Sequence, residues 1–390
     1  MTRPSAVRAG RDEMLATAAD VARTTLAQHA DDVDRNAVFP TESIAALART
    51  GLLGAALPER FGGAGLDTAA LTEIGRTLGR ACGSTAMIWA MHQVQVACVA
   101  RHSAGSAVPE ELLASLAAGG GLIASVTTEL GVGGNLRESR TSCVPHGDRV
   151  TVTKETPTVS YAQTADAFLI TARRGPDAAA GEQVLVLAAK DQATLENVGE
   201  WNTMGMRGTR SPGCRITVDV PAAQVLPVPF ADIAARTMVP LSHILWSAVW
   251  IGIAEEAAGR AVRMLRRSRR NAQPDRGPDL RAAAIGERLG LLDGLLKLVV
   301  DGYDRLARTA DGEPTTDFVI EVNNLKLAAS TETVKVTETA LEICGMAGYQ
   351  EHTDHSVSRM LRDLYSARLM ISNSRLLETN ATSMLMRRYG

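Results

Sequence analysis

The chain has 390 residues, of which 45% are hydrophobic and 22% charged, and its formal net charge at pH 7 is −2. This length exceeds one ordinary hydrophobic core, so we expect two or three domains or one large composite unit. The near-neutral charge argues against a nucleic-acid partner, and the composition argues against a disordered chain.

Cysteine usage and the N-terminus bear on the cellular location. The five cysteines are widely spaced and include no CxxC pair, which argues against a disulfide framework or a structural zinc site and favours a reducing compartment. The N-terminus has two early arginines with no apolar stretch after them, and we find no run long enough to span a bilayer. We therefore expect a cytoplasmic protein that is not embedded in a membrane.

The first third of the chain has the spacing of amphipathic helices. From Arg11 to about Gly119 apolar residues recur every three or four positions, as in MLATAADVARTTLAQHA. Pro40 followed by Thr41 predicts a capped helix start, and the glycine-rich stretch from Pro58 to Asp67 predicts a turn between helices. These patterns predict an N-terminal helical domain over residues 1–120.

The pattern then changes twice. From about Leu122 to Pro227 the chain contains short β-branched or alternating runs, among them RVTVTKE, AFLITARR, EQVLVLAAK and RITVDV, which predict a small β-barrel-like domain over residues 121–228. Beyond Pro229 the helical spacing returns in four long segments, which predict a four-helix bundle over residues 229–390, with a loop from Arg269 to Asp279. The expected fold class is therefore α+β: a helical domain, a small β domain and a helical bundle, in that order.

Four local motifs make this order more specific. They are GLLGAALPERFGGAGLD, VTTELGVGGNLRESRT, WNTMGMRGTRSPG, and ALEICGMAGYQ followed by SRMLRD. In sequence and order they resemble motifs of the acyl-CoA dehydrogenase superfamily over roughly residues 40 to 375, a span that chance rarely matches. The resemblance implies that family's fold, a flavin cofactor (FAD, with FMN as the alternative) and assembly into a homodimer or homotetramer.

The resemblance also implies a set of flavin-binding residues. Thr127 and Thr128 fall where the family contacts the flavin ring, and Ser160 falls at a flavin-facing hydroxyl. Short hydroxyl side chains suit the donors and acceptors along the edge of the ring. Thr158 replaces the family's ring-stacking tryptophan, so one face of the flavin is expected to be less shielded.

Other positions implied by the resemblance belong to more distant parts of the cofactor and to the substrate. Gly345 and Asn373 match further cofactor positions, and Arg269 lies in a stretch that has lost the Phe-Gly of the family's element for the adenosine diphosphate of FAD. Gly134, followed by Asn135, replaces a serine near the thioester, and Arg207 lies on a turn that faces the substrate or the flavin in relatives. Coenzyme A binding is therefore open, and a substrate on a carrier protein or a free small molecule remains an alternative.

The position of the family's catalytic base carries no carboxylate. Acyl-CoA dehydrogenases remove an α-proton with a glutamate that, counted from Arg362 and Asp363, corresponds to Ile371. Some members carry the glutamate on the first bundle helix instead, and that position is Ser242. The neighbouring His243 is the nearest titratable alternative, because a neutral imidazole accepts a proton near pH 7, although a packed histidine is the simpler interpretation.

Three other histidines have competing interpretations. His92 lies where family members often carry a histidine, so we interpret it first as structural and second as a weaker catalytic candidate. His352 and His355 are close in sequence, with Asp354 between them, which permits metal ligation, but no third ligand is implied. A polar surface loop is the better interpretation of this pair.

Three functions follow from these features. The first is a flavin-dependent oxidoreductase that oxidises an acyl thioester, bound to coenzyme A or to an acyl carrier protein, without the standard glutamate. The second is a two-component monooxygenase that receives reduced flavin from a flavin reductase, which the loss of the glutamates and of the ring-covering tryptophan favours. The third is a catalytically silent subunit. A shared fold does not separate them, because function depends on the site.

Overall fold

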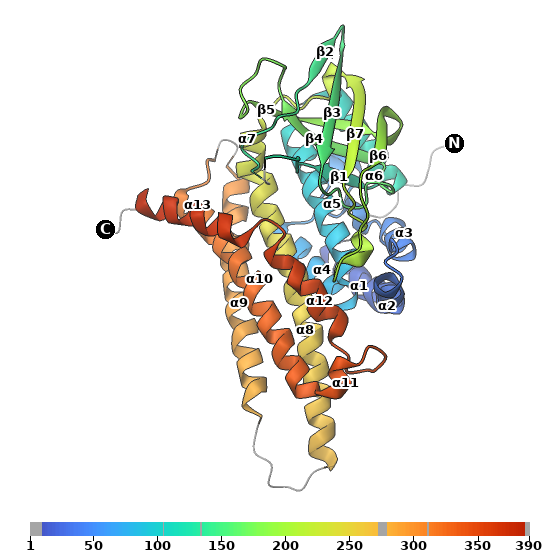
Figure 1. Cartoon of the computed structure of the whole chain (residues 1–390), viewed down its shortest axis with the longest axis vertical. Coiled ribbons are helices and arrows are strands. Elements are labelled where there is room, and N and C mark those ends of the chain that lie inside the picture. The colour runs from blue at the N-terminus through green and yellow to red at the C-terminus, as the bar shows by residue number, and fades with distance from the viewer. Residues whose placement is uncertain (1–9, 104, 133–134, 272–278, 310–311, 387–390) are drawn as a thin grey trace.

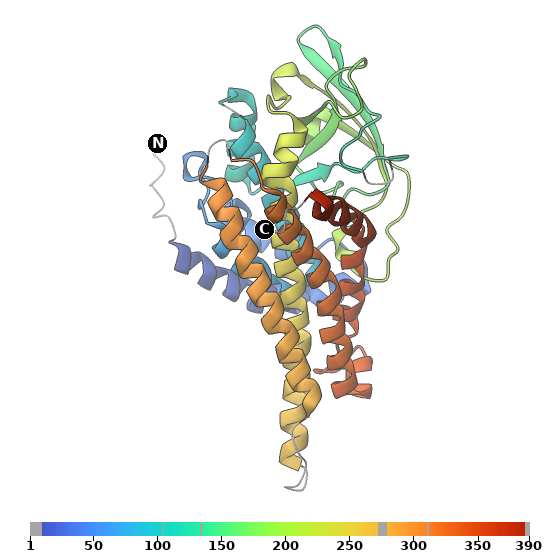
Figure 2. The same cartoon turned by 90° about the vertical axis from the view of Figure 1, so that its left-hand side faces the viewer.

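A computed structural model describes residues 10–103, 105–132, 135–271, 279–309 and 312–386, without the side chains of 269–271 and 386. Figure 1 shows a β layer at one end of an elongated molecule, with long helices extending from it and a group of shorter helices along one side. Figure 2 shows the long helices from the side.

The N-terminal region is helical, as predicted. A π-helical stretch, Ala22–Leu26, joins the first two helices, and short 3-10 turns at Leu52–Gly54 and Glu59–Phe61 lie in the glycine-rich part of the chain. Its α-helices are α1 (Arg11–Val21), α2 (Ala27–Arg35), α3 (Thr41–Arg49), α4 (Thr68–Ala81), α5 (Gly83–His102) and α6 (Ala107–Gly119).

Two details of this region refine the predictions. Helix α3 begins at Thr41 as predicted, but no side chain caps it, and the Thr41 hydroxyl donates back to the Phe39 carbonyl. The turn predicted between Pro58 and Asp67 is present, and Gly62 and Gly65 adopt left-handed φ angles of 88° and 60°, which glycine adopts without strain.

The middle of the chain forms two sheets. One has the strand order β1-β4-β5, in which β1 and β4 are parallel, and the other has the order β2-β3-β7-β6 and is antiparallel. The runs singled out in the sequence are β3, β4, β5 and β7. The strands are β1 (Ile123–Val126), β2 (Val144–His146), β3 (Arg149–Thr156), β4 (Ala167–Arg173), β5 (Gln183–Ala189), β6 (Ala193–Asn197) and β7 (Cys214–Pro221).

The C-terminal region consists of three long helices and several short ones. Helix α12 packs against α8 and α10 as a much shorter fourth member of the bundle, and α13 projects away from it (Figure 1). The helices are α7 (Phe230–Ile233), α8 (Val239–Asn271), α9 (Leu280–Ala307), α10 (Thr316–Cys344), α11 (Met346–Tyr349), α12 (Ser358–Tyr365) and α13 (Asn373–Met386). The loop predicted from Arg269 is partly wrong, because α8 continues to Asn271, and residues 272–278 lie outside the described part of the chain.

Helix α8 connects the N-terminal and C-terminal helical regions. It crosses α4 so closely that a Cβ added to Gly252 would lie 2.1 Å from the Arg76 carbonyl oxygen, and one added to Gly79 would lie 2.5 Å from that of Val249. Arg76 donates to Glu255 across the same crossing, with Nε and Oε2 2.8 Å apart. Only glycine permits this approach of the two backbones.

Among the described residues, one helical stretch is long and apolar enough to cross a membrane by length and composition, which corrects the expectation that no run reaches this length. It runs from Phe230 to Ser268 and includes most of α8, and 89% of its most apolar window is buried inside the protein. It therefore has the character of a core helix. All five cysteines are buried free thiols.

Candidate flavin site

The ends of β1 and β3 bring the predicted flavin residues together. Thr127 and Thr128 follow β1, and Thr158 and Ser160 follow β3. The Thr128 hydroxyl lies 2.7 Å from that of Thr156 and donates to the Thr158 carbonyl at 3.0 Å. The side chain of Thr158 is exposed, and the Thr127 hydroxyl has only a long contact, 3.4 Å, with Ser125.

The turn around Arg207 lies beside these strand ends. The Ser211 hydroxyl donates to Ser160 at 2.9 Å, and it also lies 2.9 Å from Thr209, whose hydroxyl donates to the Met206 carbonyl. Met206 has a left-handed φ of 52°, which turns the chain sharply before Arg207. The Arg207 Nε is buried and has no hydrogen-bond acceptor among the described residues, so this turn presents an unsatisfied cationic donor.

Asp363 ties the turn to α12. Its Oδ1 accepts a hydrogen bond from the Met206 backbone N–H at 2.6 Å, and a Cβ added to Gly205 would lie 2.1 Å from the Arg362 carbonyl oxygen. Burial raises the pKa of Asp363 to about 6, against the opposing effect of the nearby Arg359 cation. The turn at Gly205 and Met206 and the Arg362–Asp363 pair in the second half of α12 are thus in direct contact.

The corner between α12 and α13 contains the predicted base position. Ile371 has a left-handed φ of 57°, and its carbonyl accepts a hydrogen bond from the Lys326 ammonium group. Asn373 is bonded to Lys326 at 2.7 Å and to the Ser330 hydroxyl at 3.1 Å. A 3-10 turn, Ser366–Arg368, joins this corner to α12, and the Asp363 contact joins α12 to the Arg207 turn.

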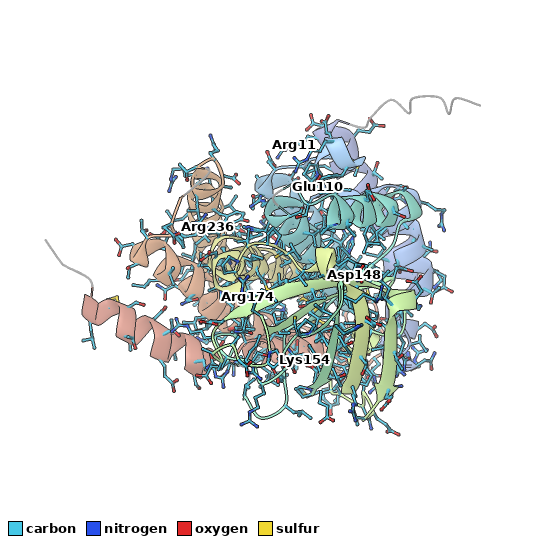
Figure 3. The ribbon with its side chains drawn as sticks, turned by 90° about the horizontal axis from the view of Figure 1, so that it is seen from above. Arg11, Glu110, Asp148, Lys154, Arg174 and Arg236 are labelled. Atoms are coloured by element: carbon cyan, nitrogen blue, oxygen red, sulfur yellow. The ribbon has the colours of Figure 1, made fainter. Side chains whose placement is uncertain are left out.

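Glu129 is a structural carboxylate. It is buried and accepts hydrogen bonds from Ser139, from the backbone of Arg140 and from both the backbone and hydroxyl of Thr141. Desolvation alone would raise its pKa, but these hydrogen bonds and the charge of Lys154, 3.8 Å away, lower it. Figure 3 shows Lys154 within the β layer. With its acceptor sites engaged, Glu129 is poorly suited to act as a base.

Two of the three predicted substrate residues, Gly134 and Asn135, belong to the segment that follows Glu129, and the third is Arg207. The Asn135 side chain accepts a hydrogen bond from the Arg137 N–H at 3.0 Å, so it stabilises its own loop. Gly134 lies outside the described residues.

His243 is buried in α8, beside Ser242. Desolvation and the charge of Lys326 lower the pKa of His243 to about 3. Neither ring nitrogen has a hydrogen-bond partner of good geometry among the described residues. An imidazole this weakly basic is a poor general base near pH 7, and Ser242, which is buried beside it, has no charge to contribute.

His92 is held by backbone groups on both sides of its ring. Its Nδ1 accepts from the Ile123 N–H at 3.1 Å, and its Nε2 donates to the Leu53 carbonyl at 3.1 Å. Burial lowers its pKa to about 4. This geometry fixes a neutral tautomer that joins α5 to β1 and supports the structural interpretation over the catalytic one.

Two predicted cofactor residues lie far from the strand ends. Gly345 ends α10, 19 residues beyond Lys326 and therefore roughly 28 Å along the helix from the corner that holds Asn373. Arg269 lies near the end of α8, and its side chain is outside the described set. Within one chain, neither residue is brought to Thr127 and Ser160.

The predicted histidine pair lies at the protein surface. His352 Nδ1 contacts the Arg35 guanidinium at 3.3 Å, and His355 Nδ1 donates to the Arg260 carbonyl at 3.3 Å. The described residues contain no group of three or more His, Cys, Asp or Glu side chains that could hold a metal.

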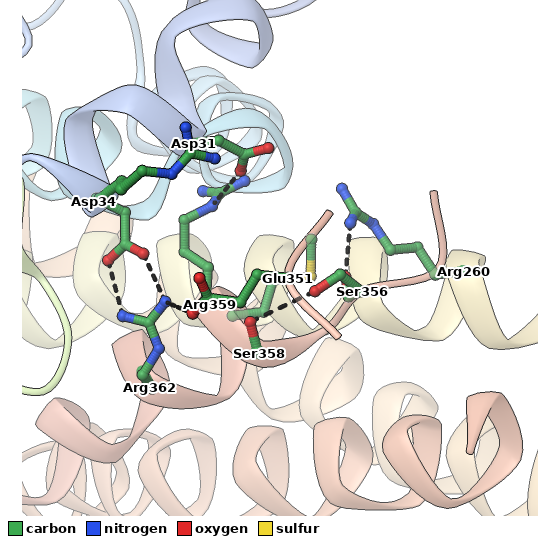
Figure 4. A pocket seen from close by; sticks show the side chains of 10 residues that line it. Asp31, Asp34, Arg260, Glu351, Ser356, Ser358, Arg359 and Arg362 are labelled. Atoms are coloured by element: carbon green, nitrogen blue, oxygen red, sulfur yellow. Dashed lines mark hydrogen bonds and ion pairs between the residues drawn. The ribbon is translucent and has the colours of Figure 1, made fainter. Parts of the chain in front are cut away.

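A charged pocket lies between α2, α8 and α12 (Figure 4). Arg362 pairs with both oxygens of Asp34, at 3.0 and 2.5 Å, and Arg359 pairs with Asp31 at 3.2 Å. Arg260 donates to the Ser356 carbonyl at 2.6 Å. These cations are already engaged, so the pocket is an ion-pair network that joins α2 to α12.

A second pocket is apolar and lies between α5, α6 and β1, where His92, Leu53 and Ile123 line it. Neither this pocket nor the charged one includes the predicted flavin residues.

Two models of one family match the chain. The model described as acyl-CoA dehydrogenase, N-terminal domain, matches residues 9–120, and the model described as acyl-CoA dehydrogenase, C-terminal domain, matches residues 234–370. Together they cover more than half of the chain, which therefore belongs to the acyl-CoA dehydrogenase family.

Individual relatives carry different activities. The chain is 26% identical over 349 residues to a probable acyl-CoA dehydrogenase, YngJ, of Bacillus subtilis, covering 88% of this chain and 89% of the relative. It is 27% identical over 358 residues to the amino sugar nitrososynthase DnmZ of Streptomyces peucetius, covering 87% of this chain and 84% of that protein.

Solved structures show the same fold. FMN-bound TdsC from Paenibacillus sp. A11-2, a dibenzothiophene monooxygenase, superposes with a TM-score of 0.83 at 18% identity, over 96% of this chain and 98% of that one. KijD3 in complex with dTDP superposes with a TM-score of 0.83 at 21% identity, over 97% of each chain. These two likenesses show the fold. Membership of the acyl-CoA dehydrogenase family makes the protein a flavin-dependent oxidoreductase, with FAD or FMN as its cofactor.

The side chains of the candidate site suit a flavin. Thr127 and Ser160 carry short hydroxyl groups just after β1 and β3, and Ser211 carries one just before β7. The buried Arg207 Nε lacks an acceptor that a carbonyl or phosphate oxygen would supply. Sequence reasoning missed Ser211 and Lys326. Ser211 lies within the quoted WNTMGMRGTRSPG motif, whereas no pattern marks Lys326 as buried.

Proposed function

We propose that this protein is a two-component monooxygenase that receives reduced flavin from a separate reductase and uses molecular oxygen to oxidise a small molecule. The observation that carries this proposal is the absence of a free carboxylate at the two base positions, which are Ile371 and Ser242. Among the described residues, two carboxylates are hydrogen-bonded to segments of the site. They are Glu129 and Asp363, and both are engaged in buried contacts. Removing an α-proton from a thioester needs an available base of that kind.

The side chains divide the work of binding. Thr127, Thr128, Ser160 and Asn373 would hold the ring of the flavin, and Arg207 would meet a carbonyl or anionic oxygen. When bound, reduced flavin supplies two electrons, so that one atom of oxygen enters the substrate and the other leaves as water. Thr158 is small and exposed, which leaves room beside the ring for oxygen and substrate.

The likenesses to DnmZ, TdsC and KijD3 support the proposal and suggest which substrates to test. DnmZ is a nitrososynthase for amino sugars, TdsC is a monooxygenase for dibenzothiophene, and KijD3 was crystallised with dTDP. A dTDP-linked amino sugar and an aromatic heterocycle are therefore the two substrate classes to examine first.

Two mixing experiments test the proposal. Purified protein with oxidised flavin is mixed anaerobically with a series of acyl-CoA thioesters, and we expect no bleaching of the flavin absorbance. The protein is then supplied with NADH, a flavin reductase, ¹⁸O₂ and each substrate class, and we expect a product that carries one ¹⁸O atom. Thioester-dependent bleaching at a catalytically useful rate, with no labelled product, would contradict the proposal.

A second candidate is oxidation of an acyl thioester bound to coenzyme A or to an acyl carrier protein. The likeness to YngJ over 88% of the chain favours it. Its signature is the bleaching described above, so the same experiment separates the two functions.

We also propose that the chain acts in the cytoplasm as a homodimer or homotetramer. Gly345 and Arg269 match cofactor positions but lie far from Thr127 within one chain, so they would reach the flavin of a second copy. Light scattering during size-exclusion chromatography tests the assembly, and a monomer that binds flavin with full affinity would contradict it.

A further inference from the structure

Lys326 is a buried cation that the family motifs do not account for. It lies in α10 with no exposed surface, and its Nζ donates to the Ile371 carbonyl and to the Asn373 Oδ1, the latter at 2.7 Å. Both acceptors are neutral, and no ion pair joins Lys326 to a carboxylate of the described residues. Burial lowers the pKa of Lys326 to about 8.

Such a lysine is costly to keep. Burial of an ammonium group without a countercharge costs several kcal/mol. A methionine of similar length would fill the same space without that cost. We therefore look for the role of this charge in the groups to which the Lys326 ammonium group donates its hydrogen bonds.

What they hold is the corner between α12 and α13. Ile371 is β-branched and has a φ of 57°, a conformation that costs such a residue about 1–3 kcal/mol and persists only where neighbouring contacts enforce it. The Lys326 ammonium group fixes this corner on both sides, through the carbonyl of Ile371 and the side chain of Asn373. Ser330, one helical turn further along α10, holds the amide of Asn373 at 3.1 Å.

The seam between α10 and α13 continues with polar contacts. The Asn323 amide donates to Asn380 at 2.8 Å, and the Asn380 amide donates to Asn324 at 3.0 Å. Leu376 is the one buried apolar side chain among the described residues of α13. The position of α13, and with it the corner, therefore depends on hydrogen bonds more than on apolar packing.

We propose that Lys326 is a positioning residue that sets the Ile371–Asn373 corner against the flavin. The inference rests on the proposed flavin site, and it does not depend on whether the enzyme performs oxygenation or dehydrogenation. Lys326 acts through Asn373, which would contact the flavin, while Lys326 itself remains behind the corner. This chain has no glutamate at position 371. The contacts of Lys326 with Ile371 and Asn373, which we call the Lys326 clamp, fix the segment where relatives place their base.

The test measures flavin affinity in wild-type protein and in Lys326→Met, Asn373→Ala and the double variant, by fluorescence titration with oxidised FMN and FAD. We expect each single variant to weaken the preferred flavin at least tenfold. Because Lys326 acts through Asn373, we expect the double variant to be no weaker than the weaker single variant, a coupling that a general loss of stability would not produce. Lys335→Met is the matched control, because Lys335 lies on the same helix and makes only a half-exposed pair with Glu332.

Several results would overturn the inference. Lys326→Met could fold and bind flavin within twofold of the wild type, or the two substitutions could weaken binding additively. If Lys326→Met does not fold, Asn373→Ala decides alone, since it removes the same contact from the exposed side of the seam, and unchanged affinity refutes the clamp. A failure of the oxygenation assay with normal flavin binding contradicts the proposed function and leaves this measurement intact.

Discussion

His92 binds backbone groups on both sides of its ring, and hydrogen-bond donors surround Glu129. His243 has no hydrogen-bond partner of good geometry among the described residues and lies near the Lys326 cation. The titratable side chains of the site are therefore already engaged or too weakly basic to react. The sequence shows where these residues lie along the chain. It does not show burial, which moves their pKa values away from the useful range.

His243 makes a prediction about acid stability. Its pKa in the folded protein is about 3 and its ordinary value is 6.5, so the unfolded chain takes up the proton first as the pH falls. The contribution of the neutral imidazole is complete above pH 6.5 and is lost below it, by at most about 1.4 kcal/mol per pH unit. We therefore expect wild-type protein to lose stability relative to His243→Leu between pH 6.5 and 4.5, as measured by urea unfolding.

The comparison is internally controlled, because the other histidines are present in both proteins. A difference in unfolding free energy that does not change with pH would show that the folded protein accepts the proton on His243. Turnover of the identified substrate by His243→Leu should stay within a fewfold of wild type at pH 7, which would also exclude His243 as the base.

The turn before β7 is defined by a contact between backbones. Gly205 lies against α12, with no room for a Cβ beside the Arg362 carbonyl, and the Met206 N–H meets Asp363. The motif was recognisable in the sequence, but its contact partner, 157 residues away in the chain, was not.

Gly205→Ala should therefore be strongly destabilising. The added methyl group overlaps backbone that cannot move without displacing α12, so we expect a loss of about 3 kcal/mol or more in unfolding free energy. Gly175→Ala is the control, because no atom lies within 4 Å of the added Cβ, and it should change stability by less than about 0.5 kcal/mol. Equal melting temperatures for the two variants would contradict the close contact.

The elements predicted best are those with a clear period. The runs that became β3, β4, β5 and β7 are apolar or alternating over seven or eight residues. In contrast, β2 and β6 have only three and five residues and are mostly exposed, so they carry little hydrophobic signal. The corner at Ile371 contains no glycine, and Lys326 lies in an ordinary amphipathic segment, so neither the left-handed turn nor the buried cation had a local signature.

The order of a helical region, a β layer and a second helical region follows from the change of period along the chain. The packing of the two helical regions against each other does not follow from the period. It depends on two glycines where α4 and α8 cross, Gly79 and Gly252, which are 173 residues apart in the chain. Glycine has a low helix propensity, so from the sequence alone these two glycines predict less stable helices.

Two glycine substitutions should have opposite effects. Gly252→Ala places a Cβ 2.1 Å from the Arg76 carbonyl oxygen and should cost about 3 kcal/mol or more by forcing α8 away from α4. Gly286→Ala, on the exposed face of α9 with no atom within 4 Å, should stabilise the protein by about 0.5–1 kcal/mol through helix propensity alone. Thermal unfolding of both variants checks the pair, and a stabilising Gly252→Ala would show that the helices do not cross this closely.

The crossing of α4 and α8 also limits how this chain can be recombined with its relatives. An exchange of the first 120 residues for those of another member would bring together two helices that were never selected for the same close approach, although every motif would be intact. Chimeras should tolerate replacement of the β layer more readily than replacement of either helical region alone. The parts that can be exchanged between relatives are then the β layer on its own and the two helical regions together. The two helical regions are discontinuous in sequence.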